Sequence, residues 1–211
     1  MKPGKIASLL LGLLWSSLSL AEPARALYSD EPPVNGALIR LINLSPAHAH
    51  AQVNGKQQAQ LIRPGQIGDY RLAPRGLVRL QVNGVSQNAM LSEGASYTYV
   101  FDGLTLQEIQ DAFAPQPHRA QIGFYNLSDR PLSLKTADAE VTVISALGPG
   151  EHASRLVNEA RLTLAAFDGE RRLAEFNELR LRRNHSYSYI LLPNGEQWLG
   201  LALSNELERL D

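Results

Sequence analysis

The sequence predicts an all-β protein with two tandem small antiparallel β-sandwich (Ig-like) domains that are related by an internal repeat. Three observations support this prediction. The stretch Ala37–Ser45 (ALIRLINLS) returns as Ala120–Ser128 (AQIGFYNLS). Turn signals such as Asn-Gly, Asp-Gly and Pro-Gly recur about every 8–12 residues, which is the spacing of an antiparallel sandwich. Stretches with helical periodicity are scarce, so strands are expected throughout the chain.

The repeat extends over most of the chain after residue 36. The Asn-Leu-Ser triplets begin at Asn43 and Asn126, an offset of 126 − 43 = 83 residues. The segments Ser96–Val100 and Ser186–Ile190 are offset by 186 − 96 = 90 residues. A drift from 83 to 90 indicates a loop insertion, while the order of the elements is kept. Each copy is far longer than a solenoid repeat, so two small domains are favoured over an array.

The N-terminus has the features of a secretory signal peptide. Lys2 and Lys5 precede the apolar run Ile6–Leu14, and a Ser-Leu-Ala sequence ends at Ala21. The run is too short for a comfortable membrane anchor, because about 20 apolar residues are needed to span a bilayer. We therefore expect export and cleavage after Ala21, with a cut after Ala26 as the alternative.

Composition excludes several classes of function. The chain has no cysteine, so neither disulfides nor thiolate metal sites can form. Removing residues 1–21 takes away two lysines and no acids, which leaves 20 − 2 = 18 basic against 21 acidic residues, a net charge of −3. This weak negative balance gives no general field that would attract nucleic acid. Stability must come from two hydrophobic cores.

In the first domain, the chain alternates between two faces and is interrupted by tight turns. In the first strand, Leu38, Arg40 and Ile42 lie on one face. Asn83-Gly84 is predicted as a hairpin turn. Later, Tyr97, Tyr99 and Phe101 are expected to face the core. Strands are expected at 38–43, His48–Val53, Gln58–Ile62, Gln66–Leu72, Leu77–Val82, Val85–Leu91 and 97–101.

Leu104–Phe113 is the least repetitive stretch, and two prolines that cannot donate to a ladder follow it. We predict that it belongs to an interdomain linker that is too short for free tumbling. The expected organisation is a signal peptide (1–21), an extended lead-in (22–36), a first domain (37–103), a linker (104–118) and a second domain (119–211). Strands of the second domain are expected at 132–136, Ala139–Ser145, Arg161–Phe167, the closing pair Leu173–Arg183 and Ser186–Leu192, and Gln197–Leu203.

No motif for nucleophilic catalysis is found. A Gly-x-Ser-x-Gly elbow is absent, and the nearest match to a Gly-Asp-Ser block is Gly68-Asp69-Tyr70, with Tyr in the place of a nucleophile. The five histidines are scattered, and their spacing does not require a shared site. We therefore predict that the protein is not an enzyme and that it uses no cofactor.

Two other polar patterns have a structural interpretation. His48 and His50 share a strand face, as in some metal sites, but no third ligand has a matching spacing, so an exposed polar face is favoured. The triplets at Asn43, Asn126 and Asn184 match the glycan acceptor pattern. For the first two, Asn and Ser that hydrogen-bond a turning backbone are the favoured interpretation.

The only basic concentration consists of Arg171-Arg172 and Arg180–Arg183, which flank and end the first strand of the predicted closing pair. Leu179 and Leu181 would point inward and leave Arg180 and Arg182 on one outer face, with Arg183 next to them. Because Arg binds carboxylates in bidentate fashion, this edge is a candidate for binding an acidic partner. Nearby glutamates favour the alternative of a solvated, neutralised face. Trp198 is the only tryptophan after the signal peptide and is a second candidate contact.

With these motifs identified, the chain resembles the AlgF family of alginate O-acetylation proteins and its relatives in exopolysaccharide acetylation systems. Four motifs carry the resemblance, and it covers essentially the whole chain after the signal peptide. They are Ala26-Leu27-Tyr28 before the Pro-rich lead-in, Arg40-x-x-Asn43, Asn126-Leu127-Ser128 and Leu132–Asp138 (LSLKTAD). The loop around His48–His50 and the Arg-rich segment Arg171–Arg183 depart from the family pattern.

The resemblance implies a periplasmic, non-catalytic accessory protein required for O-acetylation of an exopolysaccharide, alginate or a similar polymer. Its implied partners are a membrane O-acyltransferase and periplasmic acetyltransferases, which it would link as an adapter. The alternative is a secreted carbohydrate-binding β-sandwich module that holds the anionic polysaccharide itself. An exposed row of aromatic residues on one sheet face would favour that alternative.

Overall fold

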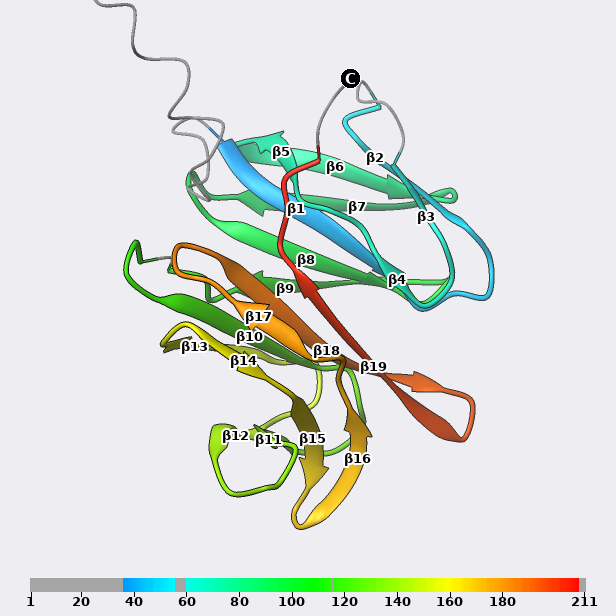
Figure 1. Ribbon diagram of the computed structural model, residues 1–211. Coiled ribbons are helices and arrows are strands. Elements are labelled where there is room, and N and C mark those ends of the chain that lie inside the picture. The colour runs from blue at the N-terminus through cyan, green and yellow to red at the C-terminus, as the bar shows by residue number, and fades with distance from the viewer. Residues whose placement is uncertain (1–35, 56–59, 115, 209–211) are drawn as a thin grey trace, which may run out of the picture.

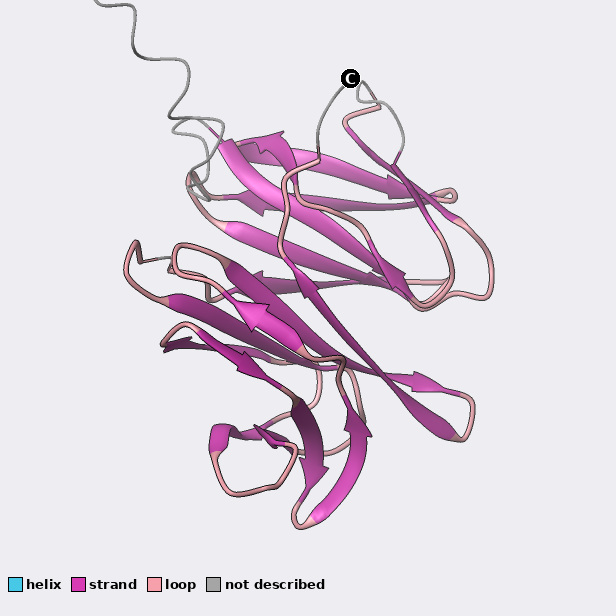
Figure 2. Ribbon diagram, in the orientation of Figure 1, coloured by secondary structure: helices cyan, strands magenta, loops and turns pink. Residues whose placement is uncertain are grey.

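The computed structural model describes residues 36–55, 60–114 and 116–208, and every regular element among them is a strand (Figure 1, Figure 2). The predicted all-β class is confirmed. The expected signal peptide and nearly all of the expected lead-in lie outside the described residues. The described residues contain no helix that is long and apolar enough to cross a membrane.

The first half (residues 36–114) contains two sheets. One sheet has the order β4-β1-β8-β9, with β5 also paired to β1, and the other has the order β3-β2-β6-β7. Apolar side chains from both sheets meet in a first core, among them Tyr97, Tyr99 and Phe101, as predicted. The strands are β1 (Gly36–Asn43), β2 (Ala49–Val53), β3 (Gln60–Ile62), β4 (Gln66–Ile67), β5 (Arg71–Pro74), β6 (Gly76–Val82), β7 (Val85–Leu91), β8 (Ser96–Phe101) and β9 (Leu106–Asp111).

The second half (residues 116–208) contains two four-stranded sheets, of order β13-β10-β18-β19 and β12-β11-β15-β16, and the ribbon β14-β17. A second core fills the space between them and includes Phe124, Leu134 and Tyr189. The strands are β10 (Ala120–Asn126), β11 (Leu132–Thr136), β12 (Thr142–Leu147), β13 (His152–Val157), β14 (Ala160–Leu162), β15 (Leu164–Asp168), β16 (Arg171–Glu175), β17 (Leu179–Leu181), β18 (Ser186–Asn194) and β19 (Gln197–Ser204).

The expectation of purely antiparallel sheets is wrong at two central positions. β1 pairs parallel with β8, with Ile39 opposite Tyr97. β10 pairs parallel with β18 in the same way, with Ile122 opposite Tyr187. In both cases several strands intervene in the sequence, so the chain has room for the crossover that parallel neighbours need. The other strand pairs are antiparallel, apart from an isolated bridge at Tyr70.

Two further expectations are corrected. Six residues of the predicted linker form strand β9, which pairs along its full length with β8. Asp102 makes the preceding turn, because its carboxylate accepts the backbone N–H groups of Leu104 and Thr105 at 2.7 Å. The expected closing pair is also different: β17 pairs with β14, and β18 pairs with β19.

The Asn-Leu-Ser triplets close β1 and β10 with the same hydrogen bonds. The Asn43 side-chain oxygen accepts the N–H and hydroxyl of Ser45 at 3.0 and 2.7 Å. The Asn126 oxygen accepts the same groups of Ser128 at 3.0 and 2.6 Å. Each side-chain amide then donates to two backbone carbonyls. Both asparagines are fully buried, which confirms the turn interpretation.

The two halves pack against each other through a central interface. It is formed by the sheet faces of β1, β8 and β9 on one side and of β10, β18 and β19 on the other. Apolar side chains from both halves form a third core there, among them Ile42, Val100, Ile109, Ile190 and Leu192. In Figure 1, β19 runs from the second half towards the first, and the described residues after it lie beside the first half.

Candidate functional site

A buried arginine stands at the centre of the central interface. Arg40 lies on β1 and is only 3% exposed. Its guanidinium donates to Thr98 Oγ1 at 3.0 Å, and to Asn205 Oδ1, Tyr125 OH and Ser188 Oγ at 2.8 Å. Because Thr98 is in the first half and the other three residues are in the second, one side chain ties both halves together.

A carboxylate lies on the other side of the same hydroxyl groups. Asp111, at the end of β9, accepts hydrogen bonds from Tyr125 OH at 2.6 Å, Tyr70 OH at 2.7 Å and Thr98 Oγ1 at 3.0 Å. The positive Arg40 and the negative Asp111 are thus connected through shared hydroxyls. We call these residues, with Ser188 and Asn205, the Arg40 network.

The two phenols of the Arg40 network act as neutral donors. Burial raises the pKa of Tyr125 above its ordinary value; the Arg40 charge opposes this effect and the Asp111 charge adds to it. Burial also raises the pKa of Tyr70 well above its ordinary value. The Tyr70 ring further contacts the guanidinium of Arg40, whose Cζ lies 4.2 Å from the ring centroid. Each phenol therefore keeps its proton and donates a hydrogen bond to Asp111.

The C-terminal residues of the second half extend the connection into the first. Asn205 accepts from Arg40 and from the Ser188 hydroxyl. The N–H of Tyr70 donates to the Glu206 carbonyl at 2.9 Å, and the N–H of Glu208 donates to the Tyr70 carbonyl at 2.8 Å. The described C-terminal residues thus add a short backbone pairing across the two halves, and Glu208 also forms an ion pair with Arg71.

A neutral histidine fills the space beside the Arg40 network. The His152 ring lies 4.2 Å from the Tyr125 ring and 5.1 Å from the Phe113 ring, between centroids. Its Nδ1 accepts the N–H of Ala112 at 2.9 Å, and its Nε2 is buried with no hydrogen-bond partner among the described residues. Burial lowers the pKa of His152 to about 4. Gly123 leaves room for this ring, because a Cβ there would lie 2.6 Å from Nε2.

The residues predicted as partner contacts lie away from the Arg40 network. Arg180 is on β17, and Arg182 and Arg183 follow it; all three are exposed. Arg180 and Arg183 both approach Glu159, at 3.7 and 3.9 Å, so part of their charge is compensated. Trp198, on β19, is half-buried and packs against the second core. The structure brings the arginines together but places Trp198 in a different sheet.

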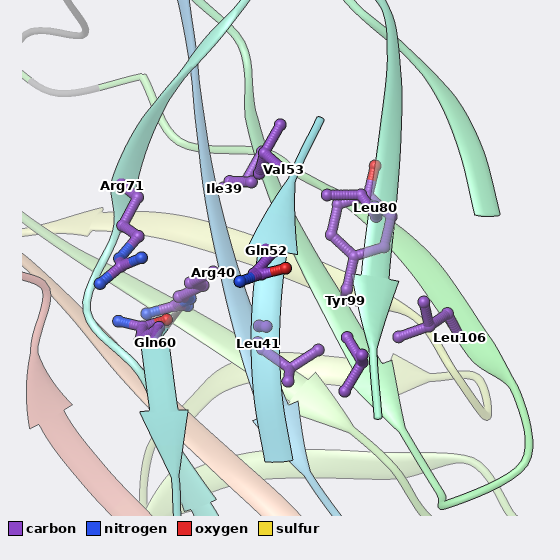
Figure 3. Close-up of a pocket in the computed structure, with 12 residues that line it drawn as sticks. Ile39, Arg40, Leu41, Gln52, Val53, Gln60, Arg71, Leu80, Tyr99 and Leu106 are labelled. Carbon is purple, nitrogen blue, oxygen red and sulfur yellow. The ribbon is translucent and has the colours of Figure 1, made fainter. Parts of the chain in front are cut away.

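The other candidate sites do not assemble into a reactive centre. Among the described residues, no group of three or more His, Cys, Asp or Glu side chains could hold a metal ion. A cavity of about 30 Å³ opens beside the first core, with room for a water molecule or two (Figure 3). Arg71 and Gln60 lie on one side of it, and Leu80, Tyr99 and Leu106 on the other (Figure 3). Its lining contains no Ser, Cys, His or carboxylate.

Sequence reasoning missed most of the Arg40 network. The sequence places Arg40 on the first strand and in a family motif without assigning it a role, and it places Asp111 in the predicted linker. One signal in the sequence points to it. Arg40 lies between Leu38 and Ile42 on the same strand face, and a charged residue among apolar ones predicts burial against a polar partner. The other six residues of the network come from six separate segments, so no local pattern could identify them.

Comparison with known proteins identifies the family. A family model described as "Alginate O-acetyl transferase AlgF" matches residues 9–188. The chain belongs to the AlgF family. The resemblance inferred from its motifs is therefore confirmed.

The similar AlgF proteins cover most of the chain. Alginate biosynthesis protein AlgF of Azotobacter vinelandii is 30% identical over 176 residues, which are 83% of this chain and 80% of that protein. The protein of the same name in Pseudomonas aeruginosa is 28% identical over 159 residues, which are 75% of this chain and 73% of that protein. A solved structure of the C-terminal domain of AlgF from P. aeruginosa is 28% identical, with a TM-score of 0.38, and covers 41% of this chain and 98% of that one.

The Arg40 network fits a structural role better than a chemical one. Its two aliphatic hydroxyls, Thr98 and Ser188, are both 0% exposed, and each is engaged in hydrogen bonds. A substrate would have to separate the two halves to reach them. The arrangement holds two sheets in a fixed relation, because each charged group has several partners and few alternative geometries satisfy them all.

Proposed function

We propose that this member of the AlgF family is a non-catalytic periplasmic accessory protein required for O-acetylation of an exopolysaccharide, alginate or a similar polymer. It acts as an adapter that links a membrane O-acyltransferase to periplasmic acetyltransferases. Family membership supports the link to polymer acetylation. The observation that carries the adapter role is the Arg40 network, because it joins the two halves into one body that presents a composite surface.

The proposal also explains why the two halves have similar strand pairings. The two halves are two copies of one Ig-like β-sandwich unit, which is supported by the matching parallel pairs β1–β8 and β10–β18. Two copies held in a fixed orientation can contact two partners at once. Binding both through one tether raises their effective concentration without any new contact between them.

Within this proposal, Arg180, Arg182 and Arg183 contribute to one partner contact. They are exposed on one edge of the second half, and Glu159 compensates only part of their charge. The side chain of Arg182 is exposed while its backbone N–H donates to Tyr187 OH at 2.9 Å, so its position is fixed by a buried residue. A carboxylate-rich partner surface would suit this edge, since guanidinium groups bind carboxylates in bidentate fashion.

A module that holds the polymer itself is less well supported. Carbohydrate-binding platforms of that kind need aromatic rings on an open face. In the described part of the chain, no Phe, Tyr or Trp side chain is exposed. Trp198, the candidate for such a contact, is half-buried against the second core. The adapter proposal therefore takes precedence.

The adapter role is tested by charge reversal in the strain that makes the polymer. We expect the double variant Arg182→Glu, Arg183→Glu to reduce both acetylation of the polymer and co-purification of the periplasmic acetyltransferase. The matched control is Arg63→Glu, an exposed arginine on the first half. Both variants should melt at the temperature of the natural protein. Full acetylation in the double variant would show that this edge makes no necessary contact.

The absence of catalysis is tested separately with an acetyl ester reporter. The purified protein should hydrolyse it no faster than the buffer does, since the described hydroxyls in the Arg40 network are buried and bonded. Turnover that one Ser→Ala substitution abolishes would overturn the non-catalytic part of the proposal.

A further inference from the structure

Three turns of the structure contain an Asn-Gly pair, which begins at Asn54, Asn83 or Asn194. In such a pair the backbone nitrogen of the glycine can attack the side-chain amide of the asparagine, because glycine has no side chain that would hinder the approach. A fourth pair, Asn35-Gly36, begins outside the described residues. The three described asparagines are all exposed, so their exposure does not separate them. Their hydrogen bonds do.

The Asn83 side chain is held by two hydrogen bonds. Its Oδ1 accepts the N–H of His50 at 3.0 Å, and its Nδ2 donates to the carbonyl of His48 at 2.7 Å. An attack by the nitrogen of Gly84 requires Cγ of Asn83 to rotate towards it, and both bonds must break first. Each bond contributes about 1 kcal/mol, so the pair should slow the attack at least about tenfold.

The Asn54 side chain is held by one hydrogen bond. Its Oδ1 accepts the N–H of Arg79 at 2.8 Å, and the backbone N–H of Asn54 donates to the carbonyl of Arg79 at 2.8 Å. Arg79 lies in the middle of β6, which pairs with β7 along its whole length. The side chain of Asn54 is therefore anchored to a regular strand, although by one bond fewer than that of Asn83.

The Asn194 side chain has no hydrogen-bond partner in the part of the chain that the structure describes. Asn194 ends β18 opposite Gln197, the first residue of β19, and Gly195 and Glu196 form the turn between them. Of these two residues only Gly195 has a positive φ, 62°, as in a type II′ turn.

The nitrogen of Gly195 is accessible. Its N–H donates to no backbone group of the described residues, and a Cβ placed on Gly195 would meet no atom within 4 Å. In Figure 1 the turn between β18 and β19 projects from the second half. Both reacting groups at this turn are therefore exposed, and the asparagine side chain is not held in place.

We infer that Asn194 is a site of spontaneous deamidation that proceeds through a cyclic imide. The backbone nitrogen of Gly195 attacks Cγ of Asn194 and forms a new C–N bond. The side-chain nitrogen leaves as ammonia and takes the proton of the Gly195 N–H with it. Water then adds to one of the two carbonyl carbons of the imide and opens the ring. The product at position 194 is aspartate or isoaspartate, and water is the only other reactant.

The modification changes the end of the β18–β19 hairpin. It adds a negative charge beside Glu196, and the isoaspartate form also adds one carbon atom to the backbone. Because the length of a hairpin loop fixes the strand register, this extra atom disturbs the pair of Asn194 and Gln197. Trp198, which lies opposite Pro193, is the next residue to lose its pairing. The hairpin should therefore loosen from its turn inward.

The test is to age the purified protein in mildly alkaline buffer and to follow each Asn-Gly peptide by mass spectrometry. In the folded protein the Asn194 peptide should deamidate at least about tenfold faster than the Asn83 peptide, with the Asn54 peptide between them. In concentrated urea the three rates should become similar, because the side-chain hydrogen bonds are lost. Equal rates at Asn83 and Asn194 in the folded protein, or a slower rate at Asn194, would overturn the inference.

Two further measurements test the cyclic imide itself. Hydroxylamine cleaves the chain at an imide, so the aged protein should yield a fragment that ends at residue 194. Gly195→Ala should slow deamidation of Asn194, because its methyl group hinders the attack, and should leave the rates at Asn54 and Asn83 unchanged. Aspartate without isoaspartate at position 194 would show direct hydrolysis of the amide and contradict the cyclic route.

Discussion

The strand pairs β1–β8 and β10–β18 have the same register. They carry different residues on the faces that meet in the central interface. Offsets of 83 and 90 residues match Ile39 with Ile122 and Tyr97 with Tyr187. On the central interface the matched residues are different. Arg40 of β1 corresponds to a glycine, Gly123, on β10 (40 + 83 = 123).

This difference shows how two similar surfaces can form a specific contact. Two copies of Arg40 facing each other would bring like charges together in a buried space, which is strongly unfavourable. With glycine at the matched position, the second half instead accommodates the His152 and Phe113 rings. At the next position on the interface face of the strand, Ile42 corresponds to Tyr125 (42 + 83 = 125). The Tyr125 hydroxyl joins Arg40 to Asp111. The interface is therefore asymmetric, while the Asn43 and Asn126 turns within each half are alike.

The largest expected effect comes from removing the cation of the interface. Arg40→Met should lower the free energy of unfolding by about 3–5 kcal/mol, because it leaves the Asp111 carboxylate buried without a compensating charge. Chemical denaturation measures this loss. In the double variant with Asp111→Asn the loss should be smaller than the sum of the two single losses. A loss below about 1 kcal/mol for Arg40→Met would contradict the central role of Arg40.

His152 should make stability depend on pH. Its pKa is lowered to about 4 in the folded protein from an ordinary value of 6.5, so between these values the unfolded chain binds the proton more readily. Stability should therefore fall as pH drops from about 6.5 to about 4, by up to about 3 kcal/mol, and His152 should cause no further loss below that. His152→Gln should remove this part of the pH dependence. An unchanged pH profile in that variant would show that another group is responsible.

The Asn turns provide the control for similarity within each half. Asn43→Ala and Asn126→Ala each remove a buried side chain with equivalent hydrogen bonds. Each should cost about 2 kcal/mol, and the two losses should agree within about 1 kcal/mol. Urea denaturation of the two variants tests the equivalence. Clearly unequal losses of unfolding free energy would show that the two turns do not contribute equally to the two halves.

The smallest expected effect is at the position that is glycine in the second half. Gly123→Ala should cost about 1 kcal/mol, because the new methyl group would press on His152 and Phe113. The same substitution in a His152→Ala background should cost less, since only the Phe113 ring then remains close to the new methyl group. Thermal melts of the four proteins measure this coupling. Equal losses in both backgrounds would indicate that His152 is not the neighbour that excludes a side chain.

The sequence predicts local structure well and the contacts between the halves poorly. Tight turns such as Asn83-Gly84 and the core-facing alternation of Tyr97, Tyr99 and Phe101 depend on neighbouring residues, so they could be identified directly. The parallel pairs and the placement of β9 depend on segments far apart in the chain. The sequence around β9 predicts a linker because it has no counterpart in the second copy and two prolines follow it. Its pairing with β8 can be seen only in the structure.

The candidate site shows the same division. Arg180, Arg182 and Arg183 are conspicuous because a cluster of charge is visible in one segment. The Arg40 network takes single residues from separate strands and from the C-terminal segment, and each of them looks ordinary where it stands. Only the fold brings them together.

The most direct test of the account is the distance between the two halves in solution. The chain has no cysteine, so spin labels can be attached at Leu77→Cys in the first half and Glu170→Cys in the second, both highly exposed positions. Pulsed electron–electron double resonance should give one narrow distribution of distances between the two labels. Adding Arg40→Met should broaden this distribution while each half keeps its strands. A broad distribution in the protein with Arg40 intact would show that the halves move independently and would contradict the single-body adapter.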